Sequence, residues 1–285
     1  SDVYKRQAQD GAGPVRFVVS AGVTSYSDFD IPGRTEGETY SYLVAERFVN
    51  PSLGGVAMER AGALYGSNAT LGNLTMALDV CATSTPEDEV FVYLCLTMAV
   101  TPRADGTPEV RILPYTAKTS DLSGTSLTVS ELAERMAAIP ARKKYLFLDA
   151  SPWSPFRPEG TPEDLVAPED ALAPLAEACT LISAVSPGQP LREESLKRPL
   201  LGFCLVTATQ GLGEGEGGGD GVITMAELGE FIRATAGRIG RGDEGAQRPA
   251  VLGGELDETV FMRSVAPDPE CPAGMRLVGG RVCVD

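Results

Sequence analysis

The sequence predicts an α/β fold, a three-layer α/β/α sandwich whose central sheet is mostly parallel. Apolar runs of strand length alternate with amphipathic segments of helix length from residue 15 to residue 239. The run EVFVYLCLTMAV at 89–100 is apolar without alternation, which is typical of a strand covered by helices on both faces. Parallel strands need long crossover connections, and the intervening helices supply them.

The first half of the chain contains the first strand and two helices ahead of the run at 89–100. VRFVVSAGV at 15–23 is rich in β-branched residues and predicts a buried strand. The segment 36–50 predicts a helix that Pro51 ends. Leucines recur at three- and four-residue steps within 68–83, which predicts a second helix. A short extended piece, EVRILP at 109–114, follows the central strand.

The second half repeats the alternation. Thr128 and Glu131 form a capping-box pattern, so a helix of about three turns begins there. It leads into the strand KKYLFLDA at 143–150. Thr224 and Glu227 form a second capping-box pattern at the start of the last helix. Between these two helices we expect one more strand and one more helix, at 179–185 and 196–210.

Composition excludes several classes of function. The chain has 24 Lys+Arg against 39 Asp+Glu, and a net charge of −15 disfavours nucleic acid as a partner. No apolar run approaches the roughly 18 residues of a membrane span. There is no histidine, so no Ser–His or Cys–His dyad and no imidazole metal ligand is available. We expect no cofactor.

The six cysteines contain no C-x-x-C pair, and the first four lie in apolar runs that predict free, buried thiols. Cys271 and Cys283 flank a short Gly-rich segment and would pair if the protein is exported. Residues 1–14 are expected to be a leader or scar outside the fold. The compartment stays open between the bacterial cytoplasm and export, the latter if a signal peptide was lost before Ala8.

Several segments in order resemble the caspase and metacaspase-like family of cysteine peptidases, across roughly residues 15 to 250. They are VFVYLCLTM (90–98), ILPYTAKTSD (112–121), SLTVSELAERMAAIPARKKYLFLDASPWS (126–154) and GDGVITMAELGEFI (219–232). The resemblance implies a caspase-like fold. It also places Thr97 where the family has its catalytic histidine and Ser151 where it has its nucleophilic cysteine, with Asp149 kept beside them.

The family mechanism needs a thiolate activated by an imidazole that also protonates the leaving amine. A hydroxyl at Thr97 does neither, and Ser151 is a weak nucleophile when no base removes its proton. Lys143 and Lys144 lie about 20 Å or more along the strand from Ser151, which is too far. We therefore expect no catalytic residues and an inactive binding or regulatory module. The alternative is an active peptidase that uses Ser151 with an unidentified base.

Trp153, the only tryptophan, follows Ser151 in SPWSP. It either covers the loop or anchors a partner. The expected partner is a protein, a peptide or another domain of the same chain. Acidic loops at 157–177 and 212–230 would face a basic partner, or they are simply solvated surface.

The chain is expected to divide into four parts. After the leader at 1–14 come a caspase-like domain at 15–252, a linker at 253–270 and a final segment at 271–285. That last segment, CPAGMRLVGGRVCVD, resembles the start of formylglycine-generating-enzyme-like domains of the sulfatase-modifying-factor type. The resemblance implies an amino-terminal module of a larger bacterial protein.

One weak calcium candidate remains in EGEGGGDGVITMAE. Glu216, Asp220 and Glu227 fit positions one, five and twelve of an EF-hand loop, but Gly218 at position three has no side-chain oxygen. The simpler interpretation makes Gly221 a turn residue and the Thr224–Glu227 pair a helix cap. We expect no metal.

Overall fold

The computed structural model describes residues 14–103, 106–155, 170–184, 186, 198–214, 220–239, 248–265, 276–278 and 282–284. Its main sheet has six strands in the order β11-β9-β7-β3-β1-β2. Every neighbouring pair is parallel except β9 and the edge strand β11. The strands are β1 (Arg16–Gly22), β2 (Ala61–Tyr65), β3 (Glu89–Cys95), β7 (Lys143–Leu148), β9 (Thr180–Ser183) and β11 (Ala250–Leu252).

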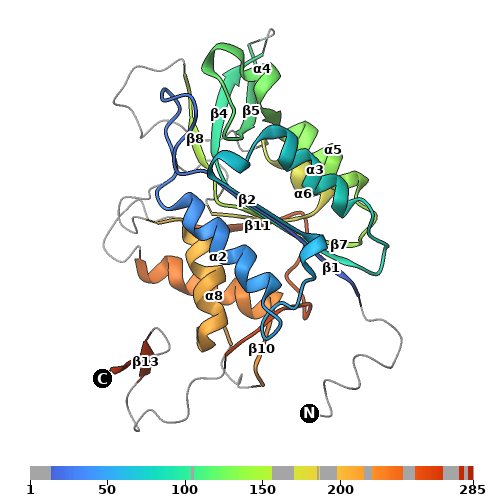
Figure 1. Ribbon diagram of the computed structural model, residues 1–285, viewed down its shortest axis with the longest axis vertical. Helices are drawn as coiled ribbons and strands as arrows, with labels where there is room; N and C mark the ends of the chain where they lie inside the picture. Colours follow the sequence, from blue (N-terminus) through green and yellow to red (C-terminus); the bar gives the residue numbers. More distant parts are fainter. Residues whose placement is uncertain are drawn as a thin grey trace.

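Helices cover both faces of this sheet, as Figure 1 shows with the sheet seen nearly edge-on. One face carries α2 (Gly37–Val49), α7 (Leu200–Thr207) and α8 (Met225–Ile239). The other carries α3 (Leu71–Cys81), α5 (Val129–Ala138) and α6 (Ala173–Ala178). Each layer of helices shares one hydrophobic cluster with the sheet. The predicted three-layer sandwich with a mostly parallel sheet is confirmed.

The run at 89–100 is two strands and not one. β3 ends at Cys95, and after Leu96 the chain enters β4 (Thr97–Pro102) of a second sheet. This sheet has four strands in the order β6-β5-β4-β8. Its other members are β5 (Pro108–Leu113), β6 (Leu127–Thr128) and β8 (Ser151–Trp153). Both halves of the apolar run are buried, so composition alone shows no break between them.

The two predicted capping boxes form. Thr128 Oγ1 accepts from the Glu131 N–H at 3.0 Å, and Glu131 Oε2 accepts from the Thr128 N–H at 2.7 Å. Thr224 and Glu227 make the same reciprocal pair at 3.2 and 2.8 Å. Each box satisfies backbone donors that the first helical turn leaves without partners. These caps fix where α5 and α8 begin.

The stretch assigned from the sequence to a linker, 253–270, contains β12 (Val260–Arg263), which pairs with β10 (Val222–Thr224). Phe261 is fully buried, and its ring meets that of Phe48 edge-on at a centroid distance of 5.5 Å. Phe261 and Met262 of this stretch thus belong to the core. Its polar composition conceals this buried pair, which belongs to the hydrophobic cluster that α2 shares with the sheet.

The final segment contains two paired antiparallel strands, β13 (Arg276–Val278) and β14 (Val282–Val284). The pairing of Cys271 with Cys283 lies outside the described residues, and the second domain stays a prediction. Among the helices described, none has both the length and the apolar character to cross a membrane. The remaining short elements are η1 (Met58–Arg60), η2 (Gly66–Asn68), η3 (Thr119–Asp121), α4 (Leu122–Thr125) and η5 (Ala208–Leu212).

Candidate functional site

Thr97 and Ser151 are direct neighbours across two parallel strands. Thr97 begins β4, Ser151 begins β8, and the two are register partners in the second sheet. They meet because β3 and β7 are adjacent in the main sheet, and the chain continues from each of these strands into the second sheet. In-register neighbours are about 4.8 Å apart along the hydrogen-bonding direction. The structure therefore brings together the two positions that the family motifs single out.

The side chain of Thr97 is buried and hydrogen-bonded. Its Oγ1 donates to the carbonyl of Pro32 at 2.7 Å, and its backbone N–H donates to the hydroxyl of Tyr26 at 2.8 Å. The Tyr26 hydroxyl in turn donates to the Leu113 carbonyl at 3.0 Å. Burial raises the pKa of Tyr26 to about 12. Near neutral pH this chain of hydroxyls therefore contains no group that accepts a proton from a substrate.

The segment 23–36, between β1 and α2, closes over Thr97. Its backbone is tied to the loop that follows β5, because the Ser27 N–H donates to the Tyr115 carbonyl at 3.2 Å. Asp28 Oδ2 accepts from the N–H and the hydroxyl of Thr119 at 2.8 and 2.9 Å. These contacts leave the Pro32 carbonyl above Thr97. No periodic or motif signal in the sequence predicts this cover.

Asp149 has no exposed surface and belongs to the interior. Its Oδ2 accepts from the Gly202 N–H at 3.0 Å, at the start of α7, and its Oδ1 lies 3.5 Å from Nη2 of Arg34. The same Nη2 donates to the Asp149 carbonyl at 3.1 Å. Burial raises the pKa of Asp149, while Arg34 and the N–H groups of Leu201 and Gly202 oppose that rise. Asp149 therefore ties the end of β7 to α7 and to segment 23–36.

Ser151 and Trp153 are both half-buried, and Trp153 packs against the edge of one hydrophobic cluster. The lysines weighed as bases belong to the other end of β7. Lys143 Nζ donates to Thr259 Oγ1 at 2.7 Å, and Lys144 Nζ donates to the Met136 carbonyl at 2.9 Å. Their ammonium groups are engaged there and face away from Ser151.

The calcium candidate does not assemble among the described residues. Glu216 lies outside them. Asp220 Oδ1 accepts from the Val222 N–H at 2.9 Å and so closes a turn. Glu227 Oε2 accepts from the Thr224 hydroxyl at 3.0 Å as part of the helix cap. No cluster of three or more metal-binding side chains occurs in the part of the chain that the structure describes.

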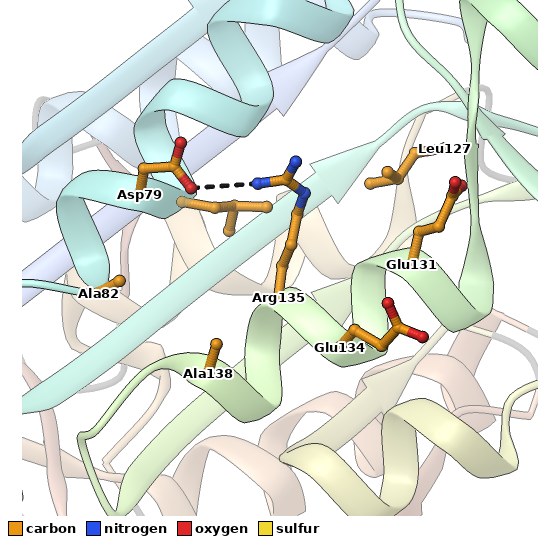
Figure 2. Close-up of a pocket in the computed structure, with 8 residues that line it drawn as sticks. Asp79, Ala82, Leu127, Glu131, Glu134, Arg135 and Ala138 are labelled. Atoms are coloured by element: carbon orange, nitrogen blue, oxygen red, sulfur yellow. Dashed lines mark hydrogen bonds and ion pairs between the residues drawn. The ribbon is translucent and has the colours of Figure 1, made fainter.

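A cavity of about 430 Å³ opens between α3 and α5, and sequence reasoning did not predict it. Figure 2 shows Arg135 of α5 reaching across its mouth to Asp79 of α3, with 3.1 Å between the paired atoms. Glu131 and Glu134 lie on the same rim. The lining residues come from α3 with Ala82 just after it, from α5 and from β6, and none of these elements carries Thr97 or Ser151.

No protein-family model and no curated protein matches the sequence. Solved structures do. Protein GSU0716 from Geobacter sulfurreducens aligns with a TM-score of 0.54 and 13% identity, over 90% of this chain and 96% of that chain. Caspase-1 from Spodoptera frugiperda aligns with a TM-score of 0.51 and 8% identity, over 87% of this chain and 88% of that chain.

Likenesses at such low identity show the fold alone. They agree with the α/β/α layers and with the mostly parallel central sheet described above. The roles of Thr97, Asp149, Ser151 and Trp153 stay predictions. The chain thus has a caspase-like fold.

Proposed function

We propose that this chain is a catalytically inactive caspase-like domain that acts as a binding or regulatory module. The proposal begins from the absence of histidine in the whole sequence. A peptidase of this family needs a base that activates its nucleophile and an acid that protonates the leaving amine. Neither role is open to the side chains at the two motif positions.

The observation that carries the proposal is the hydrogen bond from Thr97 Oγ1 to the Pro32 carbonyl. Thr97 is the register partner of Ser151, so it lies at the position to which the family resemblance assigns the base. Its hydroxyl donates its proton to a carbonyl and is covered by segment 23–36. Ser151 therefore faces a neutral, buried neighbour that cannot take its proton.

Asp149 is the carboxylate nearest along the chain, and it also fails as a base for Ser151. Its two oxygens are directed to Arg34 and to the Gly202 N–H, inside the core. Moving the carboxylate toward Ser151 would leave the buried guanidinium of Arg34 without this ion pair. Breaking a buried pair costs about 3–5 kcal/mol.

The second candidate function is hydrolysis with Ser151 as nucleophile. It is favoured by the position of Ser151, half-exposed and just beyond the carboxyl end of a parallel strand, where open α/β sheets place ligand sites. It requires a base outside the residues discussed above. The two functions predict opposite outcomes in one assay.

That assay compares the wild-type chain with Ser151→Ala on fluorogenic peptides that carry a basic, an acidic or an apolar residue before the scissile bond. We expect equal rates for both proteins, at the level of a buffer blank. Loss of a catalytic serine typically lowers the turnover number by about 10⁶-fold, so serine-dependent turnover would be unmistakable. Such turnover would replace the first proposal by the second.

As a binding module the chain needs a partner, and we propose a protein, a peptide or a further domain of the same chain. Trp153 is the candidate anchor, because a half-buried indole beside a loop offers apolar area with one polar group. Binding of a candidate partner is measured by the quenching of Trp153 fluorescence, since it is the only tryptophan. Trp153→Phe then tests whether the anchor contributes to affinity.

A further inference from the structure

The strand β2 is an open edge of the main sheet. It pairs with β1 on one side, in an unbroken register from Ala61 to Tyr65. Within the described ranges no strand pairs with its other side. Its sequence, AGALY, has no charged residue and no proline, and its register shows no bulge. The strand therefore lacks the charged residue, the proline and the bulge that usually keep an edge strand from pairing with another chain.

Exposed apolar side chains gather around this edge. In the part of the chain described, ten large hydrophobic residues are exposed, and five of them lie on β2 or on the elements that flank it. They are Tyr42, Met58, Tyr65, Met76 and Val80. Such a gathering is unusual on a protein surface that nothing covers.

These five residues lie on both faces of the sheet as well as along its edge. The rings of Tyr42, on α2, and Tyr65, at the end of β2, meet edge-on at 5.8 Å. On the other face Ala77 of α3 lies against Gly62 of β2, where a Cβ on the glycine would be 2.8 Å from the alanine Cβ. Met76 and Val80 lie farther around α3 on that same side. Exposed apolar residues thus occur on β2 itself and on the helix that flanks it at each face of the sheet.

We propose that β2 pairs antiparallel with β2 of a second copy of this chain, which joins the two main sheets into one. A twofold axis perpendicular to a sheet makes the two edge strands antiparallel, and it brings each flanking helix beside its own copy. Tyr42 would then lie near its own equivalent, and so would Met76 and Val80. This symmetry explains why both helices expose apolar residues on the side of the β2 edge.

The register that centres on Ala63 fits the side chains of the strand. It places Tyr65 opposite Ala61 and Leu64 opposite Gly62, so each large residue faces a small one. It also places Arg60 opposite Gly66. The carboxylate of Glu38 lies against that glycine, with Oε2 2.8 Å from the position a Cβ would take. At each end of the paired strands the Arg60 of one copy would therefore lie on the side of the other copy's Glu38, which is its opposite in charge, although each chain carries −15 overall.

The test is sedimentation velocity of the full chain between about 1 and 100 µM, a range that covers micromolar dissociation constants. We expect a reversible dimer of twice the chain mass. Ala63→Lys places two ammonium groups at the axis and should raise the dissociation constant at least about tenfold. The matched control is Val251→Lys, an exposed residue of β11 at the opposite edge of the same sheet, which should leave association unchanged.

A second variant, Tyr65→Ser, guards against misfolding of the first, and circular dichroism checks both. It removes an exposed ring and should also weaken the dimer. Raising NaCl from about 0.05 to 0.5 M should strengthen the dimer, because salt screens repulsion between two acidic chains. A wild-type monomer at every concentration overturns the proposal. So does an association that Val251→Lys abolishes and Ala63→Lys leaves intact. Neither result bears on whether Ser151 is reactive.

Discussion

Arg34 and Asp149 form an ion pair in the interior, with 3.5 Å between Nη2 and Oδ1 and side chains that are 1% and 0% exposed. The two residues come from segment 23–36 and from the end of β7. Their contact therefore fastens the cover of Thr97 to the strand that leads to Ser151. Charges placed so deeply are tolerated only when paired and hydrogen-bonded.

Removal of either partner should destabilise the chain strongly. Arg34→Met leaves a buried carboxylate and Asp149→Asn leaves a buried guanidinium, so each should lower the free energy of unfolding by about 3–5 kcal/mol. The double variant should lose clearly less than the sum, because the second replacement removes a residue that has already lost this ion pair. Urea denaturation of all four proteins measures the coupling. Arg135→Met, at the exposed pair with Asp79, is the control and should cost about 1 kcal/mol or less. Additivity within about 0.5 kcal/mol would contradict a direct interaction.

The hydroxyl of Thr97 should hold segment 23–36 closed. Thr97→Val keeps the shape of the side chain and removes the donor, which leaves the Pro32 carbonyl without this bond and costs about 1–3 kcal/mol. Thr97→Ser keeps the donor and serves as the control. Chymotrypsin reports the local opening, because Phe29 in this segment is 95% exposed. Cleavage after Phe29 should be faster in the valine variant and close to the wild-type rate in the serine variant. Equal rates in all three would mean that the hydrogen bond does not hold the segment.

Gly202 should resist replacement by alanine, although alanine is the better helix former. A Cβ there would collide with the Tyr93 hydroxyl oxygen and would lie 2.8 Å from Tyr40 Cβ. Such overpacking typically costs about 1–3 kcal/mol. Gly237 of α8 has no neighbouring atom within 4 Å of the same position, so Gly237→Ala should stabilise by about 0.5–1 kcal/mol. Thermal unfolding should move in opposite directions for the two variants. A stabilised Gly202→Ala would show that α7 does not pack as described.

The cap of α5 should weaken in acid. Hydrogen bonds from the backbone and side chain of Thr128 hold the pKa of Glu131 below its ordinary 4.5. A carboxylate with a lowered pKa in the folded state contributes stability above its ordinary pKa and loses it as pH falls through the folded value. Glu131→Gln should therefore be less stable than wild type at pH 7, and the difference should shrink as pH falls below about 4.5. Unfolding curves along a pH series measure it. A difference that grows in acid would have the wrong sign.

Sequence patterns predicted the layers of the fold because each buried strand is a continuous apolar run and each long helix has an apolar face or a cap. They also placed Thr97 and Ser151 next to each other through the family motifs. They did not separate β3 from β4, because Leu96 at the junction is as apolar as its neighbours. β2 was missed as well, since AGALY has neither length nor β-branched residues.

The surroundings of the site were out of reach for a different reason. The sequence around Arg34 does not predict its contact with Asp149, which is 115 positions away. The Pro32 carbonyl is a backbone group, and any residue type carries one. Such contacts depend on how a loop folds over a sheet, and a loop has no repeating pattern of apolar residues from which its path could be predicted. Phe261 was assigned to a linker for another reason, because the polar residues around it hid a core residue.

The step of β3 into β4 and of β7 into β8 has a consequence for design. Spacing between positions 97 and 151 is dictated by main-chain pairing and not by what the two side chains are. Any two side chains introduced at these positions would lie next to each other on the same face of the second sheet, at a distance set by the pairing of the two strands. Pairs of reactive side chains could therefore be introduced at positions 97 and 151, where the backbone already holds the two residues side by side.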